Sequence, residues 1–493
     1  MGLTKNSLKV KGKFDLNFTG NNLNDFYGTA RLSEASLLQG DKRLSFDSLY
    51  LSSTIDNGVR TLYVSSNEFE GRIMGKFDLA SLPDAVKVFL NRYYPSYIPT
   101  IKKQIANQSF IFDITTHTVD DYVKLIDKRL SGFNNSHLNG SLDMASNSLQ
   151  LNANVPQFSF DKYDFNNVNI NAQGDLNRLN LRGSMLNTTI NDNLSLPETN
   201  FSINASNDVS DISITTTSNQ TINKANLSAQ VTTYKNGGLS LLINKPSSFV
   251  VNGKTWSIEQ GGALDLRNNT SIPQGELVLK ESNQEIRIKA HPSEESSGTD
   301  VLVGLHNINL GDISPLISKK QRIEGFITGD VHIDDPLKSF NVESDNIEIN
   351  SLRLDNDSLG NFLGSVTYNN KSGLLGFKSL NTDPEHKIEV NGNFNLKDTT
   401  GNYKNIVHIK PTNFSIKILE LFLGNLFSDM QGFLTGNLDV ELQGDEKRFI
   451  GKGRLHNAGL KVKFTQVFYT VEDGDIELTE NEIKLGTLTI HDY

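Results

Sequence analysis

Hydrophobic and polar side chains alternate along much of the chain. In the stretch LKVKGKFDLNF, residues 8–18, apolar residues occupy every second position except Gly12, and lysine, aspartate or asparagine occupies the positions between them. Because side chains along a strand point alternately to opposite faces, this pattern predicts a β-strand with one apolar and one polar face. The apolar face could belong to the closed core of a β-sandwich, the interior of a β-helix, or the lining of a groove that holds something apolar.

The same pattern, with a glycine two positions after an apolar residue, returns along the chain. The copies are Val10-Gly12-Phe14-Leu16, Ile73-Gly75-Phe77-Leu79, Leu138-Gly140-Leu142-Met144, Ile327-Gly329-Val331-Ile333, Val390-Gly392-Phe394-Leu396 and Leu434-Gly436-Leu438-Val440, with a weaker one at Gly262-Leu264-Leu266. Several copies are about 63 residues apart. A glycine inside an alternating strand indicates a bend, a bulge or a close backbone approach. The chain is therefore expected to repeat a strand unit within a sheet that curls.

Turn signals and short helical patterns separate the alternating segments. Tight hairpins are predicted at Asn57-Gly58, Asn236-Gly237, Asn252-Gly253 and Asp473-Gly474, since these dipeptides suit two-residue turns between antiparallel strands. Apolar residues at helical spacing predict helices over 82–92, 120–130, 311–318 and 413–427. Covering sheet ends or edges is the expected task of these helices. The segment 145–300 is the most polar, so its strands should be weakly apolar.

Composition narrows the architecture and the partners. Of the 493 residues only 37% are apolar, so each strand can bury one face at most, which disfavours a parallel sheet buried on both sides. The length favours several domains or one long repeat array. A net charge of −10 gives no basic surface for phosphates, which argues against nucleic acid as a partner. The absence of cysteine fits a reducing compartment or an envelope protein without disulfides.

Catalytic and metal-binding patterns are not found in the sequence. The nine histidines are scattered without ligand spacing, no Gly-x-Ser-x-Gly nucleophile motif occurs, and there is no thiol. The acidic stretch EDGDIE, residues 472–477, lacks the spacing of a calcium loop and is interpreted as a solvated hairpin turn. We therefore expect a protein that is not an enzyme and uses no cofactor and no metal.

The C-terminal stretch 432–492 resembles the TamB/AsmA-like family of bacterial envelope proteins, in a form like those of Bacteroidetes. The points of contact are Gly432, Gly436, Gly444, Gly451, Leu455, Asn457-Ala458-Gly459-Leu460, Tyr469, Asp473-Gly474, Ile476, Ile483, Leu485 and Asp492. A helix followed by a glycine strand at 311–333 and 413–442 is similar to the repeat of this family. Before residue 300 the chain resembles the family mainly in the general character of its sequence.

The resemblance implies a mainly β fold, an elongated, twisted antiparallel half-barrel whose inner wall is an apolar groove. Such proteins are anchored in the inner membrane, cross the periplasm and carry phospholipids toward the outer membrane, and some assist outer-membrane protein assembly with a partner barrel. On this basis the chain is an internal segment, with its membrane anchor N-terminal to it and any docking region for the barrel C-terminal to it.

The predicted organisation is one continuous array. It comprises groove repeats over 1–81, helical insertions with an intervening strand over 82–132, polar groove repeats over 133–310, an AsmA-like helix and β repeat over 311–410, and a TamB-like helix and β repeat over 411–493. The residues expected to line the groove are Val10, Phe14, Leu16, Phe18, Ile73, Phe77, Leu79, Leu138, Leu142, Ile327, Val331, Ile333, Val390, Phe394, Leu396, Leu434, Leu438 and Val440.

Three functions are compatible with these patterns. The first is a non-enzymatic lipid conduit with low lipid selectivity, since hydrophobic burial scales with area and has no direction. The second is a structural or adhesive protein built as a parallel β-helix, like an autotransporter passenger. The third is a chaperone that holds strands of outer-membrane proteins on its sheet edges by β-augmentation.

Overall fold

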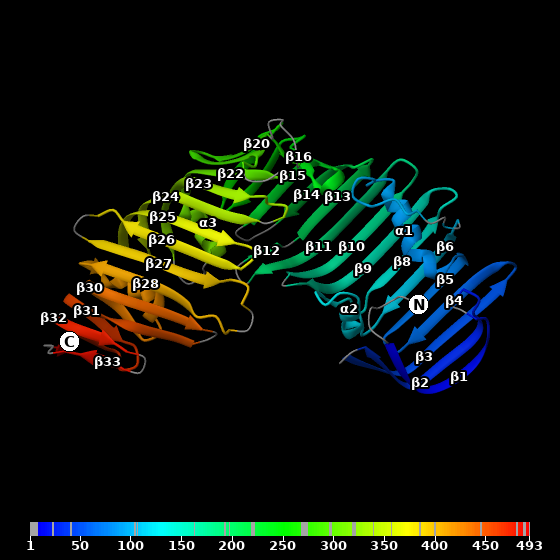
Figure 1. Cartoon of the computed structure of the whole chain (residues 1–493), viewed down its shortest axis with the longest axis horizontal. Helices are drawn as coiled ribbons and strands as arrows, with labels where there is room; N and C mark the ends of the chain where they lie inside the picture. Colours follow the sequence, from blue (N-terminus) through cyan, green and yellow to red (C-terminus); the bar gives the residue numbers. More distant parts are fainter. Residues whose placement is uncertain are drawn as a thin grey trace. The chain divides into compact units, whose positions relative to one another are not determined.

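The fold is mainly β, with one large open antiparallel sheet that is not closed on itself, as predicted (Figure 1). It is seen in a computed structural model of the chain. The structure describes residues 8–21, 24–39, 42–102, 105, 107–161, 163–191, 194–196, 198–217, 222–267, 275–294, 298–317, 322–338, 340–355, 357–383, 386–398, 401–443, 446–479, 482–486 and 490–492.

The chain divides into two compact units, Met1–Thr255 (unit 1) and Trp256–Tyr493 (unit 2), which we describe separately. The strands of unit 1 are β1 (Leu8–Thr19), β2 (Tyr27–Gln39), β3 (Lys42–Asp56), β4 (Val59–Ser66), β5 (Phe69–Lys76), β6 (Ser109–Thr116), β7 (Leu130–Gly132), β8 (His137–Asp143), β9 (Ser148–Phe160), β10 (Tyr163–Gly174), β11 (Leu179–Asn191), β12 (Leu194–Leu196), β13 (Glu198–Ser206), β14 (Val209–Thr217), β15 (Ile222–Thr233), β16 (Leu239–Leu242) and β17 (Ser247–Val251). Its helices are η1 (Leu79–Ser81), α1 (Leu82–Asn91), α2 (Asp120–Ile126) and η2 (Lys235–Gly237).

Unit 2 begins within β18 (Lys254–Ile258). Its further strands are β19 (Ala263–Leu266), β20 (Glu276–Glu281), β21 (Gln284–Pro292), β22 (Thr299–Asn309), β23 (Ile323–Asp334), β24 (Asn341–Leu354), β25 (Asp357–Asn369), β26 (Leu374–Asn381), β27 (Lys387–Asn395), β28 (Asn405–Thr412), β29 (Phe414–Ser415), β30 (Phe427–Gln443), β31 (Glu446–Val462), β32 (Val467–Leu478), β33 (Ile483–Leu485) and β34 (Ile490–Asp492). Its helices are α3 (Leu310–Ile317), η3 (Ile416–Leu419) and α4 (Glu420–Leu423).

Most neighbouring strands in sequence are also neighbours in the sheet. β1 pairs with β2, β2 with β3 and β3 with β4, all antiparallel, and the same meander runs from β20 to β28. These pairings contradict a parallel β-helix, because β-helix rungs pair in parallel. The alternative architecture considered from the sequence is therefore wrong for the described strands.

The predicted hairpin dipeptides behave differently from one another. Asn57 and Gly58 join β3 to β4 with φ of 49° and 80°, the left-handed values that a two-residue hairpin turn of this type needs. Asp473-Gly474, in contrast, lies inside β32, where Gly474 is opposite Leu455 of β31. The prediction of a turn there is wrong. The turn that joins β31 to β32 follows Val462, and its last residue, Gln466, has a φ of 59°.

The predicted helices exist, but two are shorter than expected. α1 matches its predicted range and has Pro83 in the first turn, where a missing backbone donor costs nothing. α2 ends at Ile126 because Asp127 adopts an extended backbone and its carboxylate accepts the backbone N–H of Arg129 at 3.0 Å. Leu130, predicted to be helical, starts β7.

The segment predicted as a helix over 413–427 contains only η3 and α4. Phe414 belongs to β29 and pairs with Leu434 of β30, while Phe427 begins β30 itself. Pairing with a strand twenty residues away overrides the local helical spacing, as tertiary contacts commonly do. The helix predicted over 311–318 is α3, which runs from Leu310 to Ile317. Residue 318 lies outside the described residues.

The glycines of the repeated pattern mark close approaches, as predicted. A Cβ on Gly392 would lie 2.7 Å from Cε1 of Phe377 on the neighbouring strand, and one on Gly140 would lie 2.9 Å from the Phe112 ring. Gly12 is at a β-bulge, since the register of β1 on β2 shifts between Lys11 and Lys13. The aromatic ring covers the backbone that the glycine leaves bare, a known way to stabilise glycine within a sheet.

Candidate functional site: the apolar face of the sheet

In unit 1 the strand register aligns apolar side chains across the whole sheet. Directly opposite residues share a face, so a row of paired positions can be followed from strand to strand. One row is Leu16, Ala30, Leu51, Val64, Gly71, Ile114, Leu138, Ala153, Ile170, Gly183, Phe201, Ile214 and Leu227. The adjacent row is Phe18, Gly28, Ser53, Leu62, Ile73, Phe112, Gly140, Leu151, Ala172, Leu181, Ile203, Ile212 and Ala229. We call these two rows, with the side chains flanking them, the apolar face of unit 1.

Much of this face is only partly covered. Leu62, Leu181 and Ile203 are half-buried, and at the N-terminal strand Phe14 and Leu16 are each 53% exposed. In a closed sandwich, side chains at the centre of the inner face would be almost fully buried. The half-buried rows therefore favour an open groove over the closed core that the sequence also allowed.

The opposite face of unit 1 is polar and carries an asparagine ladder. Asn152 donates to Asn139 at 3.0 Å, Asn171 donates to Asn152 at 2.5 Å, and Asn154 donates to Asn169 at 2.6 Å. These contacts link β8, β9 and β10 on one side only. Across β8, β9 and β10 the asparagines thus lie on one face of the sheet, while the two rows of the other face stay apolar.

Helix α1 covers one end of the apolar face. Ala85, Phe89 and Tyr93 are almost completely buried and pack in one cluster with Phe110 and Leu142 of the sheet. The Tyr93 hydroxyl donates to the backbone carbonyl of Asp175, and burial, together with the nearby Asp175 charge, raises the pKa of Tyr93 to about 12. α1 therefore covers the row of Phe110 and Leu142, and its cluster also contacts the neighbouring row at Ile73, Phe112 and Ile203, which stay half-buried.

Unit 2 has the same two-faced construction. One apolar row is Val366, Phe377, Gly392, Val407, Val440 and Phe449, and the adjacent row is Val390, Ile409, Leu438, Gly451 and Leu478. Much of this face is better buried than that of unit 1, since Ile388 and Val440 have no exposed surface. The larger part of this core lies against η3 and the strands beside it.

An apolar cavity of about 450 Å³ lies between the η3–α4 helices and β30, β31 and β32. It is lined by Ile416, Leu419, Leu423, Phe427, Met430, Leu455, Ala458, Gly459, Leu460, Val462, Tyr469, Val471, Ile476 and Leu478. Its volume is in the range of about 300–1,000 Å³ that small-molecule sites occupy. Apart from the Tyr469 hydroxyl, the lining side chains have no polar atom that could orient a ligand headgroup, so the cavity suits a hydrocarbon chain.

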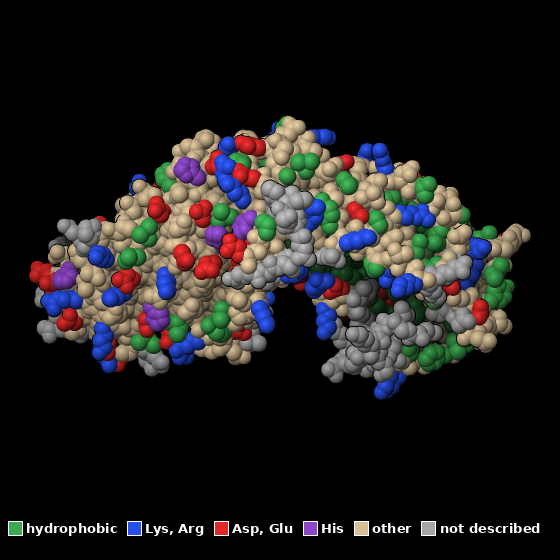
Figure 2. Space-filling model, turned by 45° about the horizontal axis from the view of Figure 1, so that its top comes forward, with side chains coloured by type: hydrophobic (Ala, Val, Ile, Leu, Met, Phe, Trp, Pro, Cys, Tyr) green, Lys and Arg blue, Asp and Glu red, His purple; other side chains and the backbone are tan. Residues whose placement is uncertain are grey.

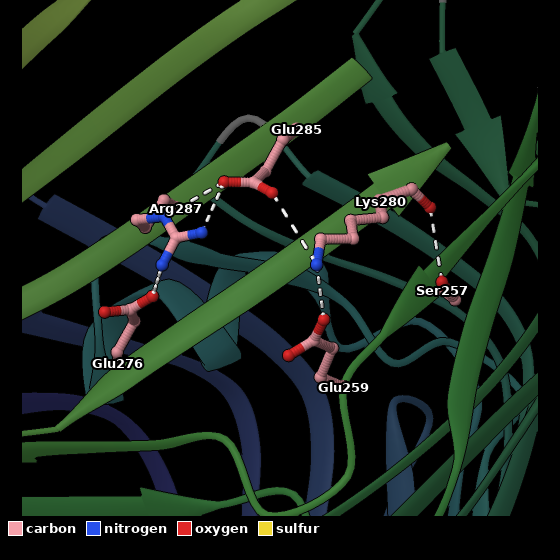
Figure 3. Close-up of polar contacts among 6 residues, drawn as sticks. All are labelled: Ser257, Glu259, Glu276, Lys280, Glu285 and Arg287. Carbon is pink, nitrogen blue, oxygen red and sulfur yellow. Dashed lines mark hydrogen bonds and ion pairs between the residues drawn. The ribbon is translucent and has the colours of Figure 1, made fainter. Parts of the chain in front are cut away.

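Charged side chains gather on the polar face of unit 2. Around β20 and β21, Arg287 donates to Glu285 at 2.7 Å and pairs with Glu276, while Lys280 donates to Glu259 at 2.7 Å (Figure 3). The hydrogen bond from Arg287 lowers the pKa of Glu285, and the bond to Glu259 raises the pKa of Lys280. These groups are partly exposed to solvent, so each pair contributes little stability. In the face shown by Figure 2, hydrophobic side chains are scattered among polar and charged ones.

The structure places most of the predicted groove residues on the two apolar faces. In unit 1 these are Val10, Phe14, Leu16, Phe18, Ile73, Leu138 and Leu142, and in unit 2 they are Ile327, Val331, Ile333, Val390, Phe394, Leu434, Leu438 and Val440. Phe77, Leu79 and Leu396 lie outside the strands. Phe77 and Leu79 are where the chain leaves β5 and enters η1, and Leu396 follows β27 and is 62% exposed.

Sequence reasoning missed many residues of the same face. Leu62, Leu151, Leu181 and Ile203 are in the row of Ile73, yet they belong to no copy of the glycine pattern. Their alternation with polar residues was a usable signal. For the residues of α1 and η3 that cover the face, no local pattern indicated which strands they contact, because these contacts join segments that are far apart in the sequence.

Outside this face, no metal-binding group of three or more His, Cys, Asp or Glu side chains occurs among the described residues. Within the same part of the chain, no helix has the length and hydrophobicity to span a membrane. No protein-family model, curated protein or solved structure matches the chain. The candidate site therefore rests on the geometry of the apolar face itself.

Proposed function

We propose that this chain is a non-enzymatic lipid carrier whose apolar face holds the acyl chains of phospholipids. In this proposal it serves outer-membrane biogenesis in a bacterial envelope. The full-length protein is anchored in the inner membrane, works in the periplasm and passes lipid toward the outer membrane, as the TamB/AsmA-like resemblance implies. An outer-membrane barrel is the proposed partner of regions beyond this chain.

The observation that carries the proposal is the pair of apolar rows in unit 1, which cross thirteen strands through twelve pairings and stay half-exposed at many positions. Continuous exposed apolar patches are rare on soluble proteins, and large ones mark binding surfaces. A row offers the same kind of contact at every strand, so an acyl chain can shift along it without losing one strong interaction.

The test is lipid photo-crosslinking from matched positions on the two faces of β4. A photoreactive amino acid replaces Leu62, whose neighbours in the row are Ser53 and Ile73, or Tyr63, which has its hydroxyl 3.3 Å from Glu70 on the other face. The intact chain is then expressed in a Gram-negative host. Irradiation should give phospholipid adducts at Leu62 and none at Tyr63, as detected by mass spectrometry.

A second measurement quantifies lipid that copurifies with the chain. Leu62→Asp should retain about tenfold less phospholipid than the parent, since a carboxylate on the acyl-chain path costs more than the burial it replaces. Thr61→Asp, on the polar face of the same strand, is the control and should retain lipid like the parent. Adducts to peptide in place of lipid at Leu62 would support the chaperone function, and equal adducts at both positions would refute a one-sided groove.

A further inference from the structure

The turn between β31 and β32 carries the most exposed large hydrophobic side chain of the described residues. Phe464 is 98% exposed, and Leu426, just after α4, is 56% exposed. The backbone N–H of Lys463 donates to the carbonyl of Leu426 at 3.0 Å, so both residues lie at the same end of the β30–β31 pair. We call Leu426 and residues 463–466 the apolar tip.

The apolar tip adjoins the cavity of unit 2. Phe427 and Val462, each next in sequence to a tip residue, are paired across β30 and β31, and both line the cavity. Leu423, the last residue of α4, lines it as well. Leu426 and Phe464 at the surface thus lie one and two residues in sequence from Phe427 and Val462 of the cavity wall.

We propose that the apolar tip inserts into the surface of a phospholipid bilayer, where it lets an acyl chain pass into the cavity. This proposal rests on the lipid-binding function proposed above and assigns one place where lipid enters or leaves. A Phe and a Leu held at one turn suit insertion at the boundary between headgroups and acyl chains, where apolar side chains gain burial.

Lys463 of the turn and Lys461 at the end of β31 fit a lipid surface. Lys461 and Lys463 lie within three residues of Phe464, and the Lys463 ammonium donates to the carbonyl of Gly424 at 2.5 Å, next to the end of α4. Cations near a membrane are attracted to anionic headgroups. The carboxylate of Glu420 is turned inward to the backbone N–H of Met430 at 2.6 Å. A protein partner would need polar groups for specificity, which the cavity lining offers only at Tyr469.

The experiment is flotation of the purified chain with vesicles of phosphatidylethanolamine and phosphatidylglycerol. The parent should float with the vesicles, and the double variant Leu426→Asp/Phe464→Asp should reduce the bound fraction about tenfold, since two apolar insertions are lost. Thr465→Asp in the same turn adds a negative charge without removing an apolar group, and its binding should fall less than twofold. Equal losses in both variants would mean that charge alone governs binding, and the insertion would be wrong.

A spectroscopic readout shows insertion directly. The chain has one tryptophan, Trp256, which is 3% exposed, so Phe464→Trp adds a separable surface signal. Insertion predicts a blue shift of the added emission with vesicles and its quenching by brominated lipid. An unshifted, unquenched emission would overturn the proposal.

Copurified lipid separates this proposal from the function on which it rests. If the double variant loses vesicle binding but still carries lipid from the cell, at a lower occupancy than the parent, both proposals stand. If the parent holds lipid and does not float, the apolar tip is wrong and the groove function survives. If the parent neither holds lipid nor floats, both fail. Flotation that requires a second protein on the vesicles would identify a protein partner and refute bilayer insertion.

Discussion

At the scale of single residues, the sheet depends on glycines that let neighbouring strands and rings come close. Gly392 lies under the Phe377 ring, Gly140 under Phe112 and Gly183 under Phe201, and in each case an added Cβ would be closer than 3.0 Å to a ring atom. These glycines have ordinary backbone conformations, so the requirement is space, not φ. Each ring in turn provides part of the apolar face.

Gly392→Ala should therefore lower the free energy of unfolding by about 1–3 kcal/mol, because the new methyl group forces the Phe377 ring or the β27–β28 pair to move. Urea denaturation followed by circular dichroism measures the effect. Gly304→Ala is the matched control: the nearest atom to its Cβ would be the Asp330 carboxylate oxygen, at 3.3 Å, and its other contacts would be at 3.8 Å. That change should stay within about 0.5 kcal/mol of the parent. A loss as large as that of Gly392→Ala would mean that the cost lies in the backbone.

At the scale of elements, α1 and the segment after it form hydrogen bonds to residues at or near the ends of several strands. The Tyr93 hydroxyl binds the Asp175 carbonyl, the Tyr94 hydroxyl lies 2.9 Å from Ser210 Oγ, and the Ser96 hydroxyl donates to Asp208 at 2.8 Å. Apolar packing of Phe89 against the sheet completes the attachment. α1 and the segment after it thus hold the ends of β10, β13 and β14 in place.

Stability should decline in alkali through Tyr93. Its pKa is raised to about 12 in the folded state, so folding favours the protonated phenol. The resulting stability is complete below the unfolded pKa of about 10 and is lost as the pH rises through the folded value. The urea midpoint of the parent should fall between about pH 10 and 12.

Tyr93→Phe removes this titration and the hydrogen bond together. At neutral pH the variant should be less stable by about 1–2 kcal/mol, since the Asp175 carbonyl loses its donor. Its midpoint should fall less steeply than that of the parent above pH 10. Tyr97→Phe, at a position 74% exposed, controls for the loss of a hydroxyl and should match the parent. A parallel alkaline decline in parent and Tyr93→Phe would assign the titration to other groups.

At the scale of the whole molecule, the strands separate two chemistries onto two faces. Apolar rows fill one side of each unit, while asparagine ladders and ion pairs such as Arg287–Glu285 occupy the other. The ladders satisfy polar groups within the face, and the charges keep it solvated. The apolar faces are covered by the helices and, in our proposal, by lipid.

This separation predicts low selectivity among lipids. Ser53, the polar side chain in the rows, is fully buried and therefore out of reach of a headgroup. Phospholipids with different headgroups or acyl lengths should therefore copurify in proportions close to those of the host membrane, within about tenfold for each species. Mass spectrometry of the extracted lipid against total host lipid measures this. Enrichment of one headgroup far beyond that range would place a specific polar site on the groove, contrary to the proposal.

Much of the fold could be predicted because its main signal is local. Alternation of apolar and polar residues determines which side chains share a face of each strand, and Asn57-Gly58 determines a turn through its own left-handed backbone. Most predicted groove residues are on the apolar faces for this reason. The turn predicted at Asp473-Gly474 was wrong because this dipeptide also tolerates an extended strand, in which Gly474 pairs with Leu455.

The sequence by itself determined the alternation, the two-faced strands and the positions of most helices, since these depend on neighbours within a few residues. Tertiary structure decided the register that joins Leu62 to Ile73 and onward to Leu181, which needs pairing between distant strands. It also decided that β29 and β30 shorten the predicted helix at 413–427, and that α1 covers one row and part of the next, in which Leu62 and Leu181 remain half-buried. Long-range pairing and packing set these features because many registers satisfy the same alternation, and only the assembled sheet selects one.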